Sequence, residues 1–245
     1  IEESIARHAE RPLFGTPDPT GVYTWTTYGE IGRRIDDLRA GLAQLVVQPG
    51  DCVGIIANNR VEWAVAAFAA YGLGARFIPM YEKELAKTWE FIINDSGLKV
   101  LFAANDKISN QVVQFRSRTP NLEHLLVIDG DTTDTMAQLE EKGRQHPVAS
   151  IRPKPEDIAV LIYTSGTTGN PKGVLLSHGN LTSNFIAGGN LFPEITHESR
   201  SLSILPWAHA YGFTAELNNF THRGASIGFI RDVTTIAEDM ANVAP

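Results

Sequence analysis

The sequence has little of several features that mark specialised classes of protein. It contains one cysteine, Cys52, which excludes an internal disulfide and a metal site built from several cysteines. Its longest apolar run, Trp63 to Ala75, is shorter than the about 20 residues needed to cross a bilayer, so we expect a buried helix there and no transmembrane segment. No signal peptide is visible, because no apolar core follows the acidic and polar start at Ile1.

Basic residues are also few, since 21 Lys and Arg stand against 28 Asp and Glu, a net charge of -7 at pH 7. This excess of acid argues against general binding of nucleic acid, which needs a basic face, but it allows a local phosphate site. With 43% hydrophobic residues the composition is that of an ordinary globular protein, large enough for one large domain or two small ones. We expect a cytoplasmic protein and leave peripheral association with a membrane open.

Hydrophobic periodicity predicts strands that alternate with helices. The first clear element is a helix expected from Thr27 to Leu45, where Thr27 and Glu30 fit a capping box. Further helices are predicted over 63–71, 88–94 (ending at a left-handed Gly97), 110–118, 136–144 and from about 180, and strands over 53–57, 77–78, 99–103, 125–128, 158–163, 174–176 and near 203 and 227. This alternation indicates βαβ crossovers and therefore an α/β fold, layered α/β/α with mainly parallel sheets.

A loop rich in glycine and hydroxyl groups follows the predicted strand at 158–163. The segment Tyr163 to Val174 reads Tyr-Thr-Ser-Gly-Thr-Thr-Gly-Asn-Pro-Lys-Gly-Val. Glycines let backbone N–H groups curl around an oxyanion, hydroxyls donate further hydrogen bonds, and Lys172 supplies a compact positive charge. These are the groups of a polyphosphate-binding loop, although a surface turn rich in Gly and Thr would have the same composition.

Three familiar motifs do not fit. The P-loop NTPase pattern fails because Lys172 lies between Pro171 and Gly173. The segment Gly72-Leu73-Gly74 has Phe77 where a dinucleotide fingerprint needs a third glycine, so we interpret it as the end of a helix. A zinc site is not supported, because the His-Glu pair at 197–198 has no second histidine at metalloprotease spacing.

The loop from Tyr163 to Val174 closely resembles the signature loop of the AMP-forming acyl and aryl ligases, the superfamily of acyl-CoA synthetases, luciferases and peptide-synthetase adenylation domains. Three more segments agree with the family in order and spacing: 23–31, 72–80 and 205–212. Within the superfamily, the segments 58–63 and 177–180 and the Trp-Ala-His at 207–209 are most similar to long-chain fatty acyl-CoA synthetases. An aryl-CoA ligase or a fatty acyl-AMP ligase is the nearest alternative.

The resemblance implies activation of a fatty acid with ATP and Mg²⁺, first to acyl-AMP and then to acyl-CoA with coenzyme A as co-substrate. It implies that Thr164 contacts the Mg²⁺ ion. It also implies that the β- and γ-phosphates of ATP lie against a run of loop residues with Lys172, a candidate catalytic residue, beside them. The members of that run are Ser165, Gly166, Thr167, Thr168 and Gly169.

The same resemblance makes His209 a candidate catalytic residue in the wall of the acyl-adenylate pocket, with Trp207 and Tyr211 as further wall residues. From the residues alone, His209 is a loop histidine satisfied by backbone groups, and the two aromatic residues are pocket wall or simple core. His178 follows a predicted strand at the start of a helix, where capping is the default interpretation.

Several segments that a ligase of this family needs are absent: the Tyr-Gly-x-Thr-Glu that completes the Mg²⁺ site, the Thr-Gly-Asp for the ribose, the hinge, and the C-terminal lid with its lysine. The stretch Tyr211 to Glu216 imitates the first of these, but it overlaps the Trp-Ala-His motif and has one residue too many, so we give it no role in metal binding.

We therefore expect residues 1–245 to be an incomplete N-terminal AMP-binding domain, inactive by itself and prone to self-association through exposed apolar surface. Its expected parts are a first α/β lobe (1–128), a helix plus linker (129–157), and the phosphate-loop and acyl-pocket segment (158–245). The missing initial Met and the abrupt end at Pro245 favour this interpretation. The alternative is a naturally short, non-catalytic module that binds acyl or phosphate groups.

Overall fold

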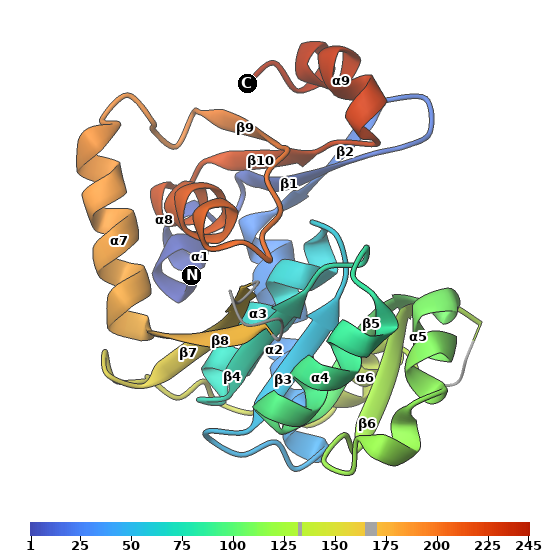
Figure 1. The fold of residues 1–245 in the computed structure, drawn as a ribbon. Helices are drawn as coiled ribbons and strands as arrows, with labels where there is room; N and C mark the ends of the chain where they lie inside the picture. The colour runs from blue at the N-terminus through green and yellow to red at the C-terminus, as the bar shows by residue number, and fades with distance from the viewer. Residues whose placement is uncertain (132–133, 165–170) are drawn as a thin grey trace. The chain divides into compact units, whose positions relative to one another are not determined.

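The computed structural model describes residues 1–131, 134–164 and 171–245 (Figure 1). It divides into two compact units, which we describe separately. Unit 1 comprises residues 1–34, 59–61 and 181–245, and unit 2 comprises residues 35–58 and 62–180. The division of the chain into segments 1–128, 129–157 and 158–245 stays a prediction.

Unit 2 is built on a six-stranded sheet with the order β6-β5-β3-β4-β7-β8. The strands are β3 (Cys52–Ile56), β4 (Arg76–Met80), β5 (Leu98–Asn105), β6 (His124–Asp129), β7 (Ile158–Thr164) and β8 (Lys172–Ser177). All pairs are parallel except β7 with β8. Every residue of the central strand β3 is buried, as expected for a parallel strand that is covered on both faces.

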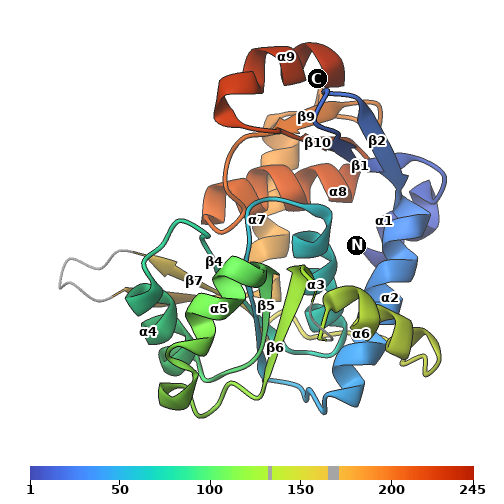
Figure 2. The ribbon, with the colours of Figure 1, turned by 90° about the vertical axis from the view of Figure 1, so that its right-hand side faces the viewer.

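Helices join these strands by crossover connections. They are α3 (Val61–Gly72), α4 (Ala86–Ser96), α5 (Asp106–Val113) with a short 3₁₀ turn (Arg116–Arg118), and α6 (Met136–Arg144). Figures 1 and 2 show α4 and α5 on one face of the sheet and α3 and α6 on the other. The predicted α/β class with mainly parallel strands is therefore confirmed.

Local signals place most of these elements close to where the sequence predicts them. The helix α2 (Tyr28–Gln44) begins after the predicted capping box, in which the Thr27 backbone N–H donates to the Glu30 carboxylate at 2.7 Å. Gly97 caps α4 with a φ of 62°, as predicted. The predicted start of the helix over 110–118 was wrong. The observed helix α5 begins at Asp106, because the Asn105 side chain caps it by accepting the Ile108 N–H.

Unit 1 is built on a four-stranded sheet with the order β2-β1-β10-β9. The strands are β1 (Pro12–Pro17), β2 (Tyr23–Thr27), β9 (Arg200–Ser203) and β10 (Ser226–Phe229); β1 and β2 form an antiparallel hairpin and the other pairs are parallel. The helices are α1 (Glu2–His8), α7 (His178–Leu191, of which residues 178–180 belong to unit 2), a π-helix (Gly212–Asn218), α8 (Asn219–Arg223), a 3₁₀ turn (Val233–Thr235) and α9 (Ile236–Val243).

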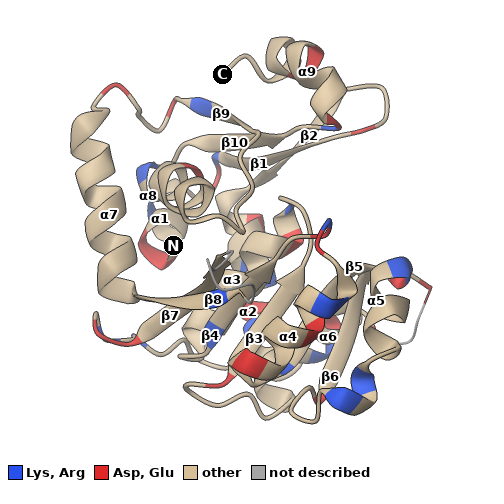
Figure 3. Cartoon of the chain, in the orientation of Figure 1, with Lys and Arg blue, Asp and Glu red and all other residues tan. Residues whose placement is uncertain are grey.

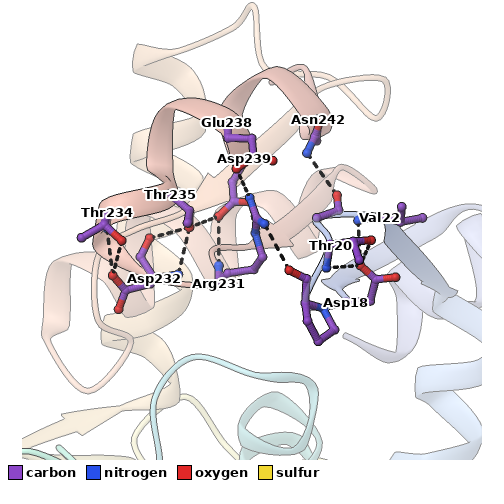
Figure 4. Close-up of polar contacts among 12 residues, drawn as sticks. Asp18, Thr20, Val22, Arg231, Asp232, Thr234, Thr235, Glu238, Asp239 and Asn242 are labelled. Carbon is purple, nitrogen blue, oxygen red and sulfur yellow. Dashed lines mark hydrogen bonds and ion pairs between the residues drawn. The ribbon is translucent and has the colours of Figure 1, made fainter.

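A polar cluster joins the β1–β2 hairpin of unit 1 to α9 (Figure 4). The guanidinium of Arg231 donates to the buried Asp239 carboxylate at 2.7 Å and forms an ion pair with Glu238 at 2.7 Å. The Asn242 side chain donates to the Gly21 carbonyl at 3.1 Å. Because Asp239 has no exposed surface, its pairing with arginine removes the cost of an uncompensated buried charge.

Charges of both signs are interspersed along the elements of unit 2 (Figure 3). Several of them pair on the surface: Arg118 with Glu90 at 2.6 Å and Arg144 with Asp37 at 3.0 Å. Such exposed pairs contribute little to stability, at most about 1 kcal/mol each. Among the described residues no helix is both long enough and apolar enough to cross a membrane.

The contact between α2 and α6 depends on glycine. A Cβ atom added to Gly143 would collide with the Asp37 carbonyl oxygen and lie 2.5 Å from the Gly41 amide nitrogen. We predict that Gly143→Ala lowers the stability of the protein by about 1–3 kcal/mol, since overpacking outweighs the gain of about 1 kcal/mol in helix propensity. Thermal unfolding measures the difference.

The matched control is Gly188→Ala in α7, where an added Cβ meets nothing within 4 Å. Because Gly188→Ala gains helix propensity and causes no collision, its melting temperature should rise or stay unchanged. A Gly143→Ala protein as stable as its parent would contradict the tight contact between α2 and α6.

Candidate functional site

The predicted phosphate loop connects the two strands of an antiparallel hairpin in unit 2. Strand β7 is buried through residues 159–162, and β8 returns beside it at the edge of the sheet. In this register Thr164 lies directly opposite Lys172, and both residues are exposed. The hairpin therefore brings together two of the predicted site residues at the point where the loop leaves the sheet.

The rest of the predicted loop lies outside the described residues. This applies to Ser165, Gly166, Thr167, Thr168 and Gly169, whose assignment to the phosphates stays a prediction.

The base of the hairpin is attached to α4 by a side-chain hydrogen bond. The Tyr163 hydroxyl donates to the Asp95 carboxylate at 2.7 Å. The tyrosine ring lies against Gly173 on β8, where an added Cβ would be 3.0 Å from the ring. Burial, followed by the bond to Asp95, raises the pKa of Tyr163, so the hydroxyl remains protonated and keeps donating at neutral pH.

The start of α7 is capped by Ser177 rather than by His178. The Ser177 hydroxyl accepts the Asn180 N–H at 3.1 Å, and the Asn180 side chain accepts the Ser177 N–H at 3.0 Å. The His178 imidazole instead packs edge-on against the ring of Tyr71, at 5.1 Å between centroids. Burial lowers the pKa of His178, which favours a neutral packing residue.

The predicted acyl-site segment lies in unit 1, between β9 and the π-helix. His209 is exposed, its backbone N–H donates to the Pro206 carbonyl at 3.1 Å, and its carbonyl accepts the Phe213 N–H at 3.0 Å. The imidazole Nδ1 accepts the Tyr211 N–H at 3.2 Å. A neutral imidazole that accepts at Nδ1 carries its proton on Nε2, which is then available to donate to a ligand.

Trp207 and Tyr211 occupy different environments in this segment. Tyr211 is 62% exposed, as a residue in the wall of an open site would be. Trp207 has no exposed surface and packs among Phe14 and Phe229, with ring centroids 5.9 and 5.5 Å away. Its role in the acyl pocket stays a prediction, and in unit 1 it is a residue of the aromatic core.

Glu216 is a buried carboxylate beside this segment. It is 8% exposed and accepts three hydrogen bonds, from the Ser201 and Ser203 hydroxyls at 2.6 and 2.7 Å and from the Trp207 indole N–H at 2.7 Å. Burial raises its pKa, and the three hydrogen bonds oppose that shift. The carboxylate is thus bound by three side chains inside the protein, and the absence of a metal role for the Tyr211 to Glu216 stretch stays a prediction.

Sequence reasoning missed both Glu216 and Asn59 as parts of this segment. A signal for Glu216 exists, because it is the one Asp, Glu, Lys or Arg between Arg200 and Arg223, and an isolated acid in an uncharged stretch suggests burial with partners. Asn59 belongs to the segment 58–63, which is similar to the corresponding segment of long-chain fatty acyl-CoA synthetases. Its amide bonds to groups far away in the sequence, so no local pattern could reveal them.

A separate cavity of about 390 Å³ lies in unit 1 near α1, α7 and α8. Its lining includes Arg7, His8, His222 and Arg223, and none of the predicted site residues that the structure describes. No group of three or more His, Cys, Asp or Glu side chains suited to a metal ion occurs within residues 1–131, 134–164 and 171–245.

Comparison with known proteins places these observations in a family. The chain is 32% identical over 262 residues to the peroxisomal long chain acyl-CoA synthetase 7 of Arabidopsis thaliana, covering 99% of this chain and 37% of that protein. It is 32% identical over 231 residues to the long-chain-fatty-acid–CoA ligase FadD15 of Mycobacterium bovis, covering 92% of this chain and 38% of that protein. The chain thus spans well under half the length of these relatives.

Solved structures share the fold at lower identity. An anthranilate CoA ligase, AuaEII, in complex with anthranoyl-AMP matches with a TM-score of 0.89 at 22% identity, over 100% of this chain and 47% of that one. The long-chain-fatty-acid-CoA ligase FadD1 of Archaeoglobus fulgidus matches with a TM-score of 0.85 at 20% identity, over 98% of this chain and 48% of that one. The family model described as "AMP-binding enzyme" matches residues 1–244, and the chain therefore belongs to the AMP-binding enzyme family.

Proposed function

We propose that the protein containing this chain activates a long-chain fatty acid with ATP and transfers it to coenzyme A. A carboxylate oxygen of the fatty acid attacks the α-phosphorus of ATP, the bond to pyrophosphate breaks, and the coenzyme A thiol then displaces AMP from the acyl-adenylate. The family membership and the names of the two curated relatives support this reaction class. The aryl ligase among the structural neighbours shares the fold and supplies no argument about the substrate.

The observation that carries the proposal is the pairing of Thr164 with Lys172 at the mouth of the loop. A buried strand and its antiparallel partner hold Thr164 and Lys172 at opposite positions, on either side of a glycine-rich connection. In the proposed reaction Lys172 offsets the negative charge that moves toward the leaving pyrophosphate. Loop backbone N–H groups would hold the phosphates.

The donors present are compatible with Mg²⁺. This ion keeps several water ligands and is bound through one or two carboxylates plus substrate phosphates. The exposed Thr164 hydroxyl would supply one oxygen ligand beside the ATP phosphates, and the carboxylate that the resemblance implies is not among residues 1–245. When bound there, the ion would neutralise phosphate charge. We place the acyl group beside His209 and Tyr211, with Trp207 behind them.

The location of the protein stays a prediction. We expect the protein to be cytoplasmic and leave peripheral membrane association open, whereas one relative is named as peroxisomal.

The first test of the proposal is Lys172→Ala in the full-length protein. Removal of one preorganised charged donor should slow adenylate formation by about 30- to 1000-fold, the equivalent of roughly 2–4 kcal/mol in the transition state. Fatty-acid-dependent exchange between pyrophosphate and ATP measures this step directly.

Lys154→Ala serves as the control, because Lys154 is exposed in the same unit and lies outside the loop. The control should leave exchange unchanged. Equal exchange rates in the parent and Lys172→Ala would refute the phosphate role of the loop.

The second test concerns the substrate. Long, flexible fatty acids should give a higher kcat/KM than acetate or aromatic acids, because an apolar channel gains about 0.8 kcal/mol for each buried methylene until it is full. A panel of carboxylates from acetate to palmitate, with benzoate and cinnamate, measures the preference. A higher kcat/KM for the aromatic acids would replace the fatty acid ligase with an aryl-CoA ligase.

A third test concerns residues 1–245 as an isolated polypeptide. We expect no acyl-AMP or acyl-CoA from it, because binding of pyrophosphate groups without a complete site for the reacting atoms cannot lower the barrier. Incubation with radiolabelled palmitate, ATP, Mg²⁺ and coenzyme A gives the answer. Turnover that disappears in Lys172→Ala would show instead that these residues suffice for catalysis.

A further inference from the structure

The Glu216 carboxylate in unit 1 accepts hydrogen bonds from three side chains, two on strand β9 and one in the segment that follows it. Strand periodicity places Ser201 and Ser203 on one face of β9, and both hydroxyls donate to the carboxylate. The Trp207 indole N–H donates to the same oxygen as Ser203. Within residues 1–131, 134–164 and 171–245 no arginine or lysine forms an ion pair with Glu216.

Asn59 extends this network to the backbone of the acyl-site segment. Its amide nitrogen donates to the Ser203 hydroxyl at 2.9 Å and to the Leu205 carbonyl at 2.7 Å. Its amide oxygen accepts the Trp207 backbone N–H at 2.8 Å. Trp207 is thus held at both ends, by Asn59 at its backbone and by Glu216 at its ring.

The residues that follow have little freedom to move independently of Trp207. A Cβ atom on Gly212 would lie 2.5 Å from the Pro206 carbonyl oxygen, so the π-helix packs directly on the turn before His209. The His209 backbone bonds to Pro206 on one side and to Phe213 on the other. A π-helix is rare and often marks a functional site, and here it brings Glu216 back to Trp207.

We propose that Glu216 is a positioning residue of the acyl site, which acts through the Trp207 indole to fix the place of His209. This inference rests on the proposed function, because it assumes that His209 faces the acyl group. A carboxylate suits the task, since it can only accept hydrogen bonds and all three groups facing it can donate. Charged acceptors also form shorter and stronger hydrogen bonds than neutral ones.

Two substitutions at Glu216 separate positioning from loss of the fold. In Glu216→Gln the amide oxygen can still accept from Trp207 and Ser203, while the amide N–H group donates to the Ser201 hydroxyl, which is able to accept. In Glu216→Ala the buried indole N–H loses its partner. Trp207→Phe keeps an aromatic ring but removes the N–H, and therefore tests the same bond from the other side.

Steady-state kinetics of the full-length protein give the functional readout. We expect kcat/KM for palmitate to fall about tenfold in Glu216→Ala, because this substitution leaves the buried Trp207 indole N–H without an acceptor. In Glu216→Gln, kcat/KM should be close to the parent value. The KM for ATP should not change. Trp207→Phe should show the same defect, and the double variant Glu216→Ala/Trp207→Phe should be no worse than either single one.

The control is Glu194→Gln, an exposed acid in the same unit, which should match the parent in every measurement. Additive losses in the double variant, or an equal rise in the KM for ATP, would overturn the proposal, because each indicates general damage rather than one shared bond. An unchanged kcat/KM for palmitate in Glu216→Ala would overturn it as well.

A spectroscopic arm tests the bond without relying on activity. In protein labelled with ¹⁵N-tryptophan, the indole N–H resonance of Trp207 is the one lost in Trp207→Phe. It should shift in Glu216→Gln and titrate with pH in the parent but not in that variant. If the Trp207 resonance responded neither to Glu216→Gln nor to pH, the hydrogen bond would be refuted, even if Glu216→Ala failed to fold.

The two arms also distinguish the two proposals. A parent protein that activates no fatty acid would refute the proposed function, and the kinetic part of this inference with it. The Trp207 resonance would then still report whether Glu216 holds the indole ring.

Discussion

The hairpin of β7 and β8, which carries the predicted phosphate loop, depends on the burial of strand β7 in the sheet of unit 2. Its residues 159–162 are inaccessible or nearly so, and its backbone pairs with β4 on one side and with β8 on the other. Buried backbone groups must be paired, so this strand cannot shift without breaking hydrogen bonds at both of its edges. The loop therefore starts from a fixed point at Thr164 and ends at a fixed point at Lys172. A rigid support of this kind is what preorganised charge stabilisation needs.

Unit 1 uses a different constraint, the satisfaction of buried polar groups. An indole N–H and a carboxylate without partners would each destabilise the core, whereas Trp207 and Glu216 bond to each other and to the serines of β9. The aromatic contacts with Phe14 and Phe229 hold the same ring from its other sides. The contacts that keep the core intact are therefore the contacts that place the segment around His209.

Structural features that depend on neighbours within one or two turns of chain could be predicted from the sequence. The capping box at Thr27, the left-handed Gly97 and the helix Met136–Arg144 all belong to this group, and the structure confirms them. The start of α5 was missed because a side chain just before the predicted helix, Asn105, ends the strand and caps the helix at once. Hydrophobic periodicity could not reveal this start, because it depends on the spacing of apolar residues and not on the hydrogen bond made by one capping side chain.

The sequence by itself determined the alternation of strands and helices, the phosphate-loop composition and the family, because these are carried by residue types in order along the chain. Only the tertiary structure decided that β8 runs antiparallel beside β7, so that Thr164 faces Lys172, and that Glu216 holds Trp207 while Asn59 holds the turn before it. These arrangements arise from hydrogen bonds between groups that lie apart in the sequence. Their geometry exists only once the sheets have formed and water has been excluded from the groups that bond.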